Sequence, residues 1–490
     1  MSLKIGMKAV DITPTGPVNL QGQFRLRVTT EVETPVMANI FVAESNGEQI
    51  VICACDLVGI HDSFLRKLRE KIKAKTSEIN TDAIMISAIH THTGPYTYPE
   101  GFIGGLDPRY APDGITVIPN VTIPPDMWSG DKTRDYITTI VADAICDAWE
   151  NRDDAYYGAA FGRAVVGHCR RACYDDGTSK LFGTTQTGTF TELEAGNDTG
   201  VELLYVFDKN KKPIGALVNV ACPAQCVEDM NVISSDYWGK VREWVQREIN
   251  EDFVVVGLCS AAGDQCPIDL IRRYRLKNPD NRMYRRSDSF AMENHFEGAA
   301  EIGKRLGREI VERIPEAREN MKSEAVIKNE TAIIDLPLRR VTTSEYNEHL
   351  IKVREKIREF GTTEITPGQA SSIHIHTGAI KRYFVQDERP SFETEVHVVR
   401  FDDIAFATNA FELFIDYGNR IRAVSPAAQT FLVQLCNGAL GYLPTEKAEK
   451  GSHYSAYVSS GWTGHEGGNL LVSKTVTLLN KLFSDVEKTK

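Results

Sequence analysis

The sequence has no hydrophobic run long enough to cross a bilayer, and residues 1–6 are too short and polar for a secretory signal. We therefore expect a cytoplasmic protein without a transmembrane segment, although the opening Met-Ser-Leu also fits a trimmed export signal. Basic residues are in deficit, since 56 lysines and arginines face 67 acidic residues for a net charge of −11. This balance argues against nucleic acid or an acidic membrane surface as the main partner.

Cysteine is also sparse, because ten cysteines spread over 490 residues do not make a disulfide scaffold. This usage suits a reducing compartment. The chain has no internal repeat, no low-complexity linker and no break in composition, so we expect one domain spanning residues 1–490. A hydrophobic content of 42% with 25% charged residues is that of a globular protein and excludes a disordered chain. No pattern indicates an oligomeric state.

What the chain does have is an alternation of strand-like and helix-like segments, which predicts an α/β fold with a mixed sheet core and flanking helices. Ala38–Glu44 and Gln49–Asp56 surround Asn46-Gly47, a strong hairpin signal. Tyr96–Asp131 is rich in proline and glycine, and we interpret it as a rim over a site. The pattern further predicts helices over 62–75, 132–150, 287–313 and 343–360, one ending near 248, and strands over 83–88, 155–167, 203–207, 215–221, 253–258, 325–336, 393–399, 404–408 and 429–435.

Five of the strand-like segments end in polar, turn-rich loops. In open α/β sheets, ligands bind in the crevice outside the carboxyl ends of the strands, so we expect these loops to converge. They are HTHTGP at 90–95, ACPAQC at 221–226, AAGDQCP at 261–267, NAFELF at 409–414 and GALGYLPT at 438–445.

The first of these loops follows a buried strand-like run and carries two histidines. His90 and His92 are two residues apart, so in an extended segment both rings would project from the same face. Neutral imidazole is the commonest metal ligand, and such a pair can begin a zinc site. A bare pair is as often a hydrogen-bonding feature of a loop, so its meaning depends on the residues around it.

The string SAIHTHTGP, residues 87–95, resembles the signature of the neutral/alkaline (non-lysosomal) ceramidases, whose members are zinc amidases. The resemblance implies a ceramidase-type catalytic domain. It also implies that His90 is a zinc ligand, together with Glu412 in Ala410-Phe411-Glu412 and Tyr442 in Gly441-Tyr442.

The same resemblance implies which groups stabilise the oxyanion of a reacting carbonyl. His92 matches the second histidine of the signature. Tyr454 lies twelve residues after Tyr442, where the family has a further tyrosine. An arginine of the family corresponds to Arg170 or Arg171.

Two cysteines stand where the resemblance implies other residues. Cys222 holds the place of a histidine ligand, which makes it the expected fourth ligand of Zn²⁺. A thiolate there would lower the net charge of the site from +1 toward zero and weaken the activation of a bound water. Cys266, in GDQCP, replaces a serine, and it could be a buried small residue, a thiol near the zinc or a nucleophile.

A second histidine pair lies in SIHIHTG. No motif of the family covers His374 and His376, so we expect them to be loop or strand residues rather than ligands.

The sequence thus indicates a zinc-dependent hydrolase that resembles neutral ceramidase and cleaves a linear N-acyl amide with metal-activated water. The substrate would be a small or lipid-like amide, since the chain ends at Lys490 without the C-terminal immunoglobulin-like domain of secreted ceramidases. Two alternatives stay open. One is a metal-free cysteine hydrolase that uses Cys266 with His92 as its base, and the other is a non-catalytic relative that binds a ligand.

Overall fold

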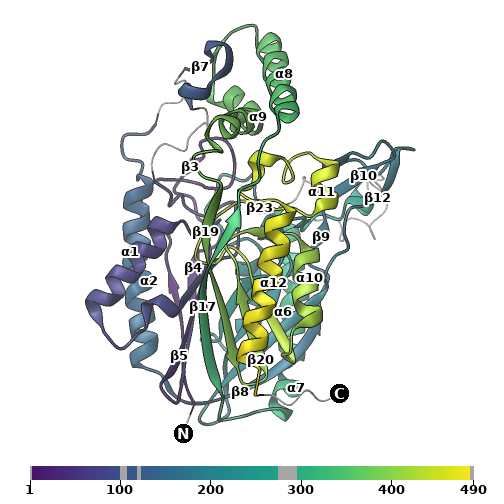
Figure 1. Cartoon of the computed structure of the whole chain (residues 1–490). Helices are drawn as coiled ribbons and strands as arrows, with labels where there is room; N and C mark the ends of the chain where they lie inside the picture. Colours follow the sequence, from purple (N-terminus) through teal and green to yellow (C-terminus); the bar gives the residue numbers. More distant parts are fainter. Residues whose placement is uncertain (1–2, 100–106, 119–122, 274–294, 486–490) are drawn as a thin grey trace, which may run out of the picture.

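Two β-sheets lie face to face at the centre of the chain in a computed structural model, which describes residues 3–99, 107–118, 123–273 and 295–485 (Figure 1). The larger sheet has eight strands in the order β15-β14-β13-β8-β1-β4-β5-β6, and the smaller has the order β17-β19-β20-β22. The strands of the larger sheet are β15 (Val254–Cys259), β14 (Pro213–Val220), β13 (Gly200–Asp208), β8 (Asp153–Arg163), β1 (Lys4–Asp11), β4 (Met37–Ser45), β5 (Glu48–Cys55) and β6 (Ile84–Ala88). Those of the smaller sheet are β17 (Ile327–Pro337), β19 (Ser391–Phe401), β20 (Ile404–Thr408) and β22 (Gln429–Val433).

Apolar side chains fill the space between the sheets and the space between each sheet and its helices. Phe41 and Leu204 of the larger sheet meet Phe401 and Phe431 of the smaller one in the central layer. The outer face of the larger sheet is covered by α1 (Asp62–Lys75), α2 (Gly130–Glu150), α3 (Tyr237–Glu248), α6 (His295–Glu312) and α7 (Ile314–Glu319). The outer face of the smaller sheet is covered by α10 (Ile415–Val424) and α12 (His465–Leu482). The architecture is therefore a four-layered α/β/β/α arrangement.

The predicted fold class is confirmed, and most elements fall where the sequence patterns place them. Asn46 and Gly47 both have positive φ angles, 55° and 84°, so the hairpin of β4 and β5 turns as the Asn-Gly signal predicts. The predicted helix over 287–313 is present as α6, and residues 287–294 lie outside the described part. The sequence did not separate the two sheets, because a strand buried on both faces has the same apolar pattern in either sheet.

Two helices form a unit at the upper end of the molecule in Figure 1, α8 (Thr343–Phe360) and α9 (Pro367–Val385). A segment of the predicted rim loop joins this unit, because β7 (Thr116–Val117) pairs with β18 (Glu364–Ile365) and Ile115 packs among its apolar residues. The expectation of a loop or strand around His374 and His376 is wrong, since both lie within α9. The helix begins with a capping box of Thr366 and Gln369 and with Pro367 in its first turn, a start signal that was readable in the sequence.

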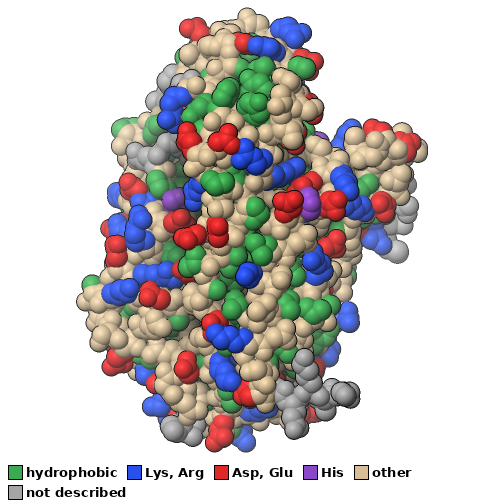
Figure 2. Space-filling view, in the orientation of Figure 1, with side chains coloured by type: hydrophobic (Ala, Val, Ile, Leu, Met, Phe, Trp, Pro, Cys, Tyr) green, Lys and Arg blue, Asp and Glu red, His purple; other side chains and the backbone are tan. Residues whose placement is uncertain are grey.

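The remaining short elements lie in the connections. They are β2 (Val18–Asn19), β3 (Val28–Thr29), β9 (His168–Cys169), β10 (Arg171–Tyr174), β11 (Ser179–Leu181), β12 (Phe190–Leu193), β16 (Gln265–Cys266), β21 (Glu412–Leu413), β23 (Tyr442–Leu443), α4 (Leu270–Arg273) and α11 (Glu446–Gly451). None of the helices in the described ranges is long and apolar enough to span a bilayer. On the face shown in Figure 2, basic and acidic side chains are interspersed rather than gathered into one basic patch.

Candidate active site

The five strand-end loops meet at one end of the two sheets. The strands β6, β14 and β15 belong to the larger sheet and β20 and β22 to the smaller, and three parallel pairs among the core strands (β5–β6, β14–β15 and β20–β22) carry these strands to that end. The predicted convergence of the loops is therefore confirmed. Each loop supplies at least one residue to the site. Together with two further residues they form a set that we call the polar cluster: His90, His92, Arg170, Gln225, Glu228, Gly263, Glu412 and Tyr442.

His90 enters the polar cluster from a strained turn rather than from an extended strand. Strand β6 ends at Ala88, and His90 has a φ of 67°, in the left-handed region that non-glycine residues rarely adopt. Its Nδ1 lies 2.6 Å from the carbonyl oxygen of Val58, which can only accept, so Nδ1 carries the proton. In a neutral His90 ring, Nε2 then carries a lone pair. This nitrogen lies 3.3 Å from Glu412 Oε2.

Glu412 and Tyr442 are neighbours because their short strands pair. In the parallel pair β21–β23, Glu412 is the register partner of Tyr442. Burial raises the pKa of Glu412, but the positive charges beside it, that of His90 when its ring is protonated and that of Arg170, lower it more. Its Oε2 is buried and has no hydrogen-bond partner within the described residues. Burial next to Glu412 raises the pKa of Tyr442 well above its usual value.

Arg170 is the buried cation of the polar cluster. Its Nη2 donates to the carbonyl oxygen of Gly263 at 2.8 Å and to the Tyr442 hydroxyl at 3.3 Å, and lies 3.7 Å from Glu412 Oε2. Its Nη1 donates to Gln225 Oε1 at 3.3 Å. Burial lowers the pKa of Arg170, but Tyr442 and Glu412 raise it by more than burial lowers it. The guanidinium therefore stays charged.

Arg171 points away from the polar cluster and has a structural role. Its Nε donates to Glu194 at 2.6 Å, and its two Nη atoms donate to the carbonyl oxygens of Tyr454 and Ser452. The sequence left the choice between Arg170 and Arg171 open, and the geometry favours Arg170 as the residue that faces the site.

His92 lies beside His90, with 3.3 Å between the two Nε2 atoms. It also contacts two residues that the sequence patterns did not indicate. Gln225 Nε2 lies 2.7 Å from His92 Nε2, and Glu228 Oε2 lies 3.3 Å from His92 Nδ1. Gln225 lies in the predicted ACPAQC loop and Glu228 two residues after it, and only the path of the chain in space reveals their contacts with His92.

Tyr454 covers the polar cluster from a tightly wound loop. Ser452, His453 and Ser455 all have φ between 61° and 75°, a strained path of the kind that gathers at functional sites. The Tyr454 ring packs edge-on against Tyr442 with 5.6 Å between centroids and against the half-exposed Phe24 at 6.2 Å. Burial raises the pKa of Tyr454 to about 12, so its hydroxyl keeps its proton at neutral pH.

The structure does not bring Cys222 or Cys266 against the other predicted site residues. Cys222 Sγ lies 3.6 Å from the carbonyl oxygen of Val166 and 3.4 Å from that of Pro223, and burial raises the pKa of its thiol well above the usual value. Cys266 Sγ contacts the backbone of Ile268, and burial raises its pKa to about 12. Both are therefore neutral thiols near pH 7.

The donor atoms around His90 suit a metal ion on three sides. Two ligands on one tetrahedral zinc lie about 3.4 Å apart, given metal–ligand distances of about 2.0–2.1 Å. The lone pairs of His90 Nε2 and Glu412 Oε2 face each other at a similar separation, 3.3 Å. Two facing acceptors with no hydrogen between them require a cation or a proton. The Tyr442 hydroxyl offers a third ligand atom. Counting only His, Cys, Asp and Glu side chains, no group of three or more among the described residues could hold a metal.

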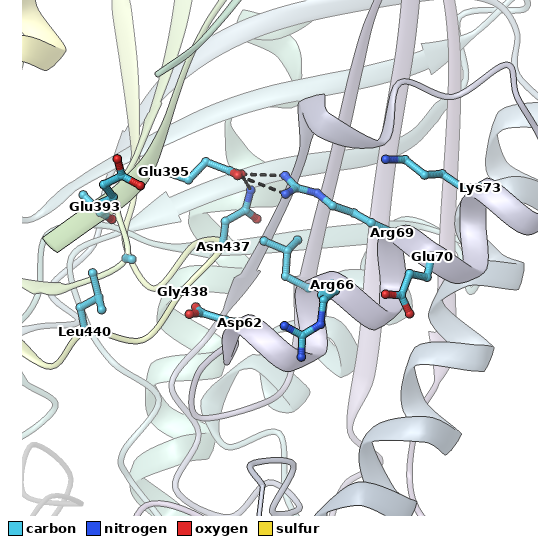
Figure 3. Close-up of a pocket in the computed structure, with 13 residues that line it drawn as sticks. Asp62, Arg66, Arg69, Glu70, Lys73, Glu393, Glu395, Asn437, Gly438 and Leu440 are labelled. Atoms are coloured by element: carbon cyan, nitrogen blue, oxygen red, sulfur yellow. Dashed lines mark hydrogen bonds and ion pairs between the residues drawn. The ribbon is translucent and has the colours of Figure 1, made fainter. Parts of the chain in front are cut away.

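A cavity of about 500 Å³ is lined in part by Ala410, Gly438 and Leu440, which belong to the loops that carry Glu412 and Tyr442 (Figure 3). The side chains of Glu412 and Tyr442 do not line it. Arg69 of α1 forms a bidentate ion pair with Glu395 there, and Asn437 donates to the same carboxylate at 2.7 Å. Asn437 begins the loop that leads to Tyr442. The charged lining of this cavity therefore serves to hold that loop in place.

Gly22 predicts a sharp steric test of the site. Gly22 has a φ of 107°, and an alanine Cβ there would lie 2.4 Å from Cγ of His92. Gly47 has a similar φ of 84° but nothing within 4 Å, so Gly47→Ala isolates the backbone strain, about 1–2 kcal/mol. We expect Gly22→Ala to lose roughly 1–3 kcal/mol more in urea unfolding, from overpacking, and to shift the His92 ring signals in NMR spectra. Equal losses in the two variants with unshifted His92 signals would contradict the contact.

Known proteins that share this fold were found by comparison of sequence and of structure. No model of a known protein family matches the chain. It is 32% identical over 98 residues to a neutral ceramidase of Oryza sativa subsp. japonica, a match that covers 19% of this chain and 12% of that protein.

The solved structures cover much more of the chain. A ceramidase complexed with C2 superposes with a TM-score of 0.69 at 15% identity, over 99% of this chain and 76% of that one. A neutral ceramidase from Pseudomonas aeruginosa superposes with a TM-score of 0.68 at 16% identity, over 98% of this chain and 75% of that one. The resemblance predicted from the sequence is thus confirmed at the level of the fold, and the chain has the fold of the neutral ceramidases.

Proposed function

We propose that this protein is a hydrolase that cleaves an amide bond at the polar cluster. The proposal depends on the distance of 3.3 Å between His90 Nε2 and Glu412 Oε2, which face each other in a chain that has the fold of the neutral ceramidases. The pair is buried next to a guanidinium and two tyrosine hydroxyls. An assembly of one cation site and several fixed hydrogen-bond donors suits the addition of water to a carbonyl group.

We further propose that His90, Glu412 and Tyr442 hold a zinc ion. Three protein ligands are the usual number at a catalytic zinc, which keeps one position for water or substrate. A zinc ion bound there would supply a Lewis acid for the carbonyl oxygen and would lower the pKa of a water molecule. Cys222 as a fourth ligand stays a prediction, and its neutral thiol and its contacts with Val166 and Pro223 support a place in the core instead.

The protein's own residues would stabilise the negative charge that develops on the carbonyl oxygen. Arg170 is charged and only 3% of its side chain is exposed, so its hydrogen bonds are strengthened by the low dielectric of the site. The Tyr454 hydroxyl keeps its proton, because its pKa is about 12, and can donate. Both groups are held before substrate binds, and such preset donors are the largest catalytic term in many enzymes.

The substrate class that fits is a small or lipid-like amide without net charge. Two ionised carboxylates, Glu412 and Glu228, face the single guanidinium of Arg170, so the protein groups offer no excess positive charge to an anion. Phe24, 52% exposed, packs on Tyr454 and on the ring of His374 of α9, with centroids 4.1 Å apart in the latter pair. These rings form an aromatic edge at which an apolar part of the substrate can lie.

The cysteine hydrolase is the second candidate, and two observations weigh against it. The Cys266 thiol is protonated near pH 7 because burial raises its pKa to about 12. Its sulfur contacts the backbone of Ile268 rather than the ring of His92. A ligand-binding protein without catalysis would keep the polar cluster but release no product, which the experiments below distinguish.

The metal assignment predicts how the wild type and two variants behave in elemental analysis and zinc titration. Wild-type protein purified without chelator should contain about one zinc per chain. Glu412→Gln should weaken zinc binding by more than about 100-fold, beyond the 10- to 100-fold cost of losing a supporting residue. Cys222→Ser should keep its zinc, because the Cys222 sulfur contacts the backbone carbonyl oxygens of Val166 and Pro223. Loss of zinc in Cys222→Ser with retention in Glu412→Gln would reverse the assignment.

The Cys266→Ser variant tests which group attacks the substrate. In hydrolysis assays over a panel of N-acyl amides, this variant should keep most of the wild-type rate, while chelation of the wild type should abolish it. A serine hydroxyl is hardly ionised at neutral pH, so a thiol mechanism would collapse in the same variant. Activity that survives chelation and disappears in Cys266→Ser would establish the thiol mechanism, and no hydrolysis of any member of the panel would favour the binding protein.

A further inference from the structure

The hydrogen-bond directions around His92 follow from one side chain that can only donate. Arginine has five N–H donors and no acceptor. Arg170 Nη1 lies 3.3 Å from Gln225 Oε1, so the oxygen of this amide must face the guanidinium. The amide nitrogen of Gln225 therefore points the other way, toward the ring of His92.

The amide of Gln225 in turn sets the tautomer of His92. Gln225 Nε2 donates to His92 Nε2 across 2.7 Å, so this ring nitrogen must carry a lone pair. The proton of the neutral ring is then on Nδ1, which faces Glu228 Oε2 at 3.3 Å. Burial raises the pKa of Glu228, but its hydrogen bond with His92 and the charge of Arg170 lower it more, so an ionised acceptor stands there. The four side chains thus form a chain in which each hydrogen bond has one allowed direction.

The backbone around this chain is braced on both sides. Arg27, 4% exposed, donates through Nη1 to the carbonyl oxygen of Glu228 at 2.7 Å and through Nη2 to that of His92. One guanidinium therefore ties the loop after β6 to the loop after β14. Gly22 lies against the His92 ring, and a Cβ at this position would lie 2.4 Å from Cγ of that ring.

We propose that Gln225 and Glu228 are positioning residues that hold His92 as its Nδ1–H tautomer, so that His92 Nε2 carries no proton and does not act as an oxyanion donor. The inference deepens the proposed function, on which its catalytic meaning rests. In this arrangement the one lone pair of His92 Nε2 accepts from Gln225, and His92 has no proton there to donate to His90 Nε2, 3.3 Å away, or to the oxyanion. The oxyanion is left to Arg170 and Tyr454, both of which contact Tyr442.

The tautomer can be measured without any assay of activity. Protein labelled with ¹⁵N in its histidine rings should show His92 protonated at Nδ1 and not at Nε2, with the signals assigned by their loss in His92→Gln. Glu228→Ala should shift the tautomer of His92, and Glu228→Gln should preserve it, because the glutamine oxygen still accepts from Nδ1. Gln225→Glu should move the proton toward Nε2, since a carboxylate accepts where the amide donates.

Kinetics separates positioning from a merely structural role. We expect kcat to fall about 10- to 100-fold in Glu228→Ala with little change in KM, and to recover in Glu228→Gln. The matched control is Asp229→Ala, which removes the neighbouring carboxylate that pairs with Arg25 at the surface and should change neither tautomer nor kcat. A wild-type His92 protonated at Nε2, or a tautomer indifferent to Glu228→Ala, overturns the inference. Failure of hydrolysis with the expected tautomer would instead refute the proposed function alone.

Discussion

The buried guanidinium of Arg170 is the interaction on which the rest of the site depends. It bonds the carbonyl oxygen of Gly263, the hydroxyl of Tyr442 and the amide of Gln225, and it lies near the carboxylate of Glu412. These four groups come from four different strand-end loops, in both sheets. A buried charge left without partners is costly, so the pairing that keeps Arg170 charged also fixes the distances among the loops.

The same constraint explains the electrostatic balance of the site. Burial raises the pKa of Glu412 while Arg170, and His90 when its ring is protonated, lower it, and burial raises the pKa of the Cys222 thiol. The sequence-based expectation of a thiolate ligand at Cys222, and of a site with zero net charge, stays a prediction. With Glu412 as the one anionic ligand, a bound Zn²⁺ would leave a charge of +1 on the metal and its ligands, which favours the activation of water.

Much of the fold could be predicted from local patterns, because those patterns have local causes. The helix over 62–75 and the Asn46-Gly47 hairpin follow from periodicity and from turn chemistry, and both lie where they were expected. The meeting of the five loops followed from the general rule that ligands bind at strand ends. The same rule placed the loop of Gln225 at the site, but the contacts of Gln225 and Glu228 with His92 could not be predicted, since they depend on how two loops cross in space. The helix that contains His374 begins with a capping box of Thr366 and Gln369, a local start signal from which this helix was predictable.

The most direct test of the account is the position of a metal in a crystal of the protein grown with zinc and without chelator. Diffraction data collected above and below the zinc absorption edge would locate the ion independently of any activity. The account predicts one anomalous peak per chain, within bonding distance of His90 Nε2, Glu412 Oε2 and the Tyr442 hydroxyl and away from Cys222 Sγ. The absence of a peak between His90 and Glu412, or a peak held by Cys222 without Glu412, would contradict it.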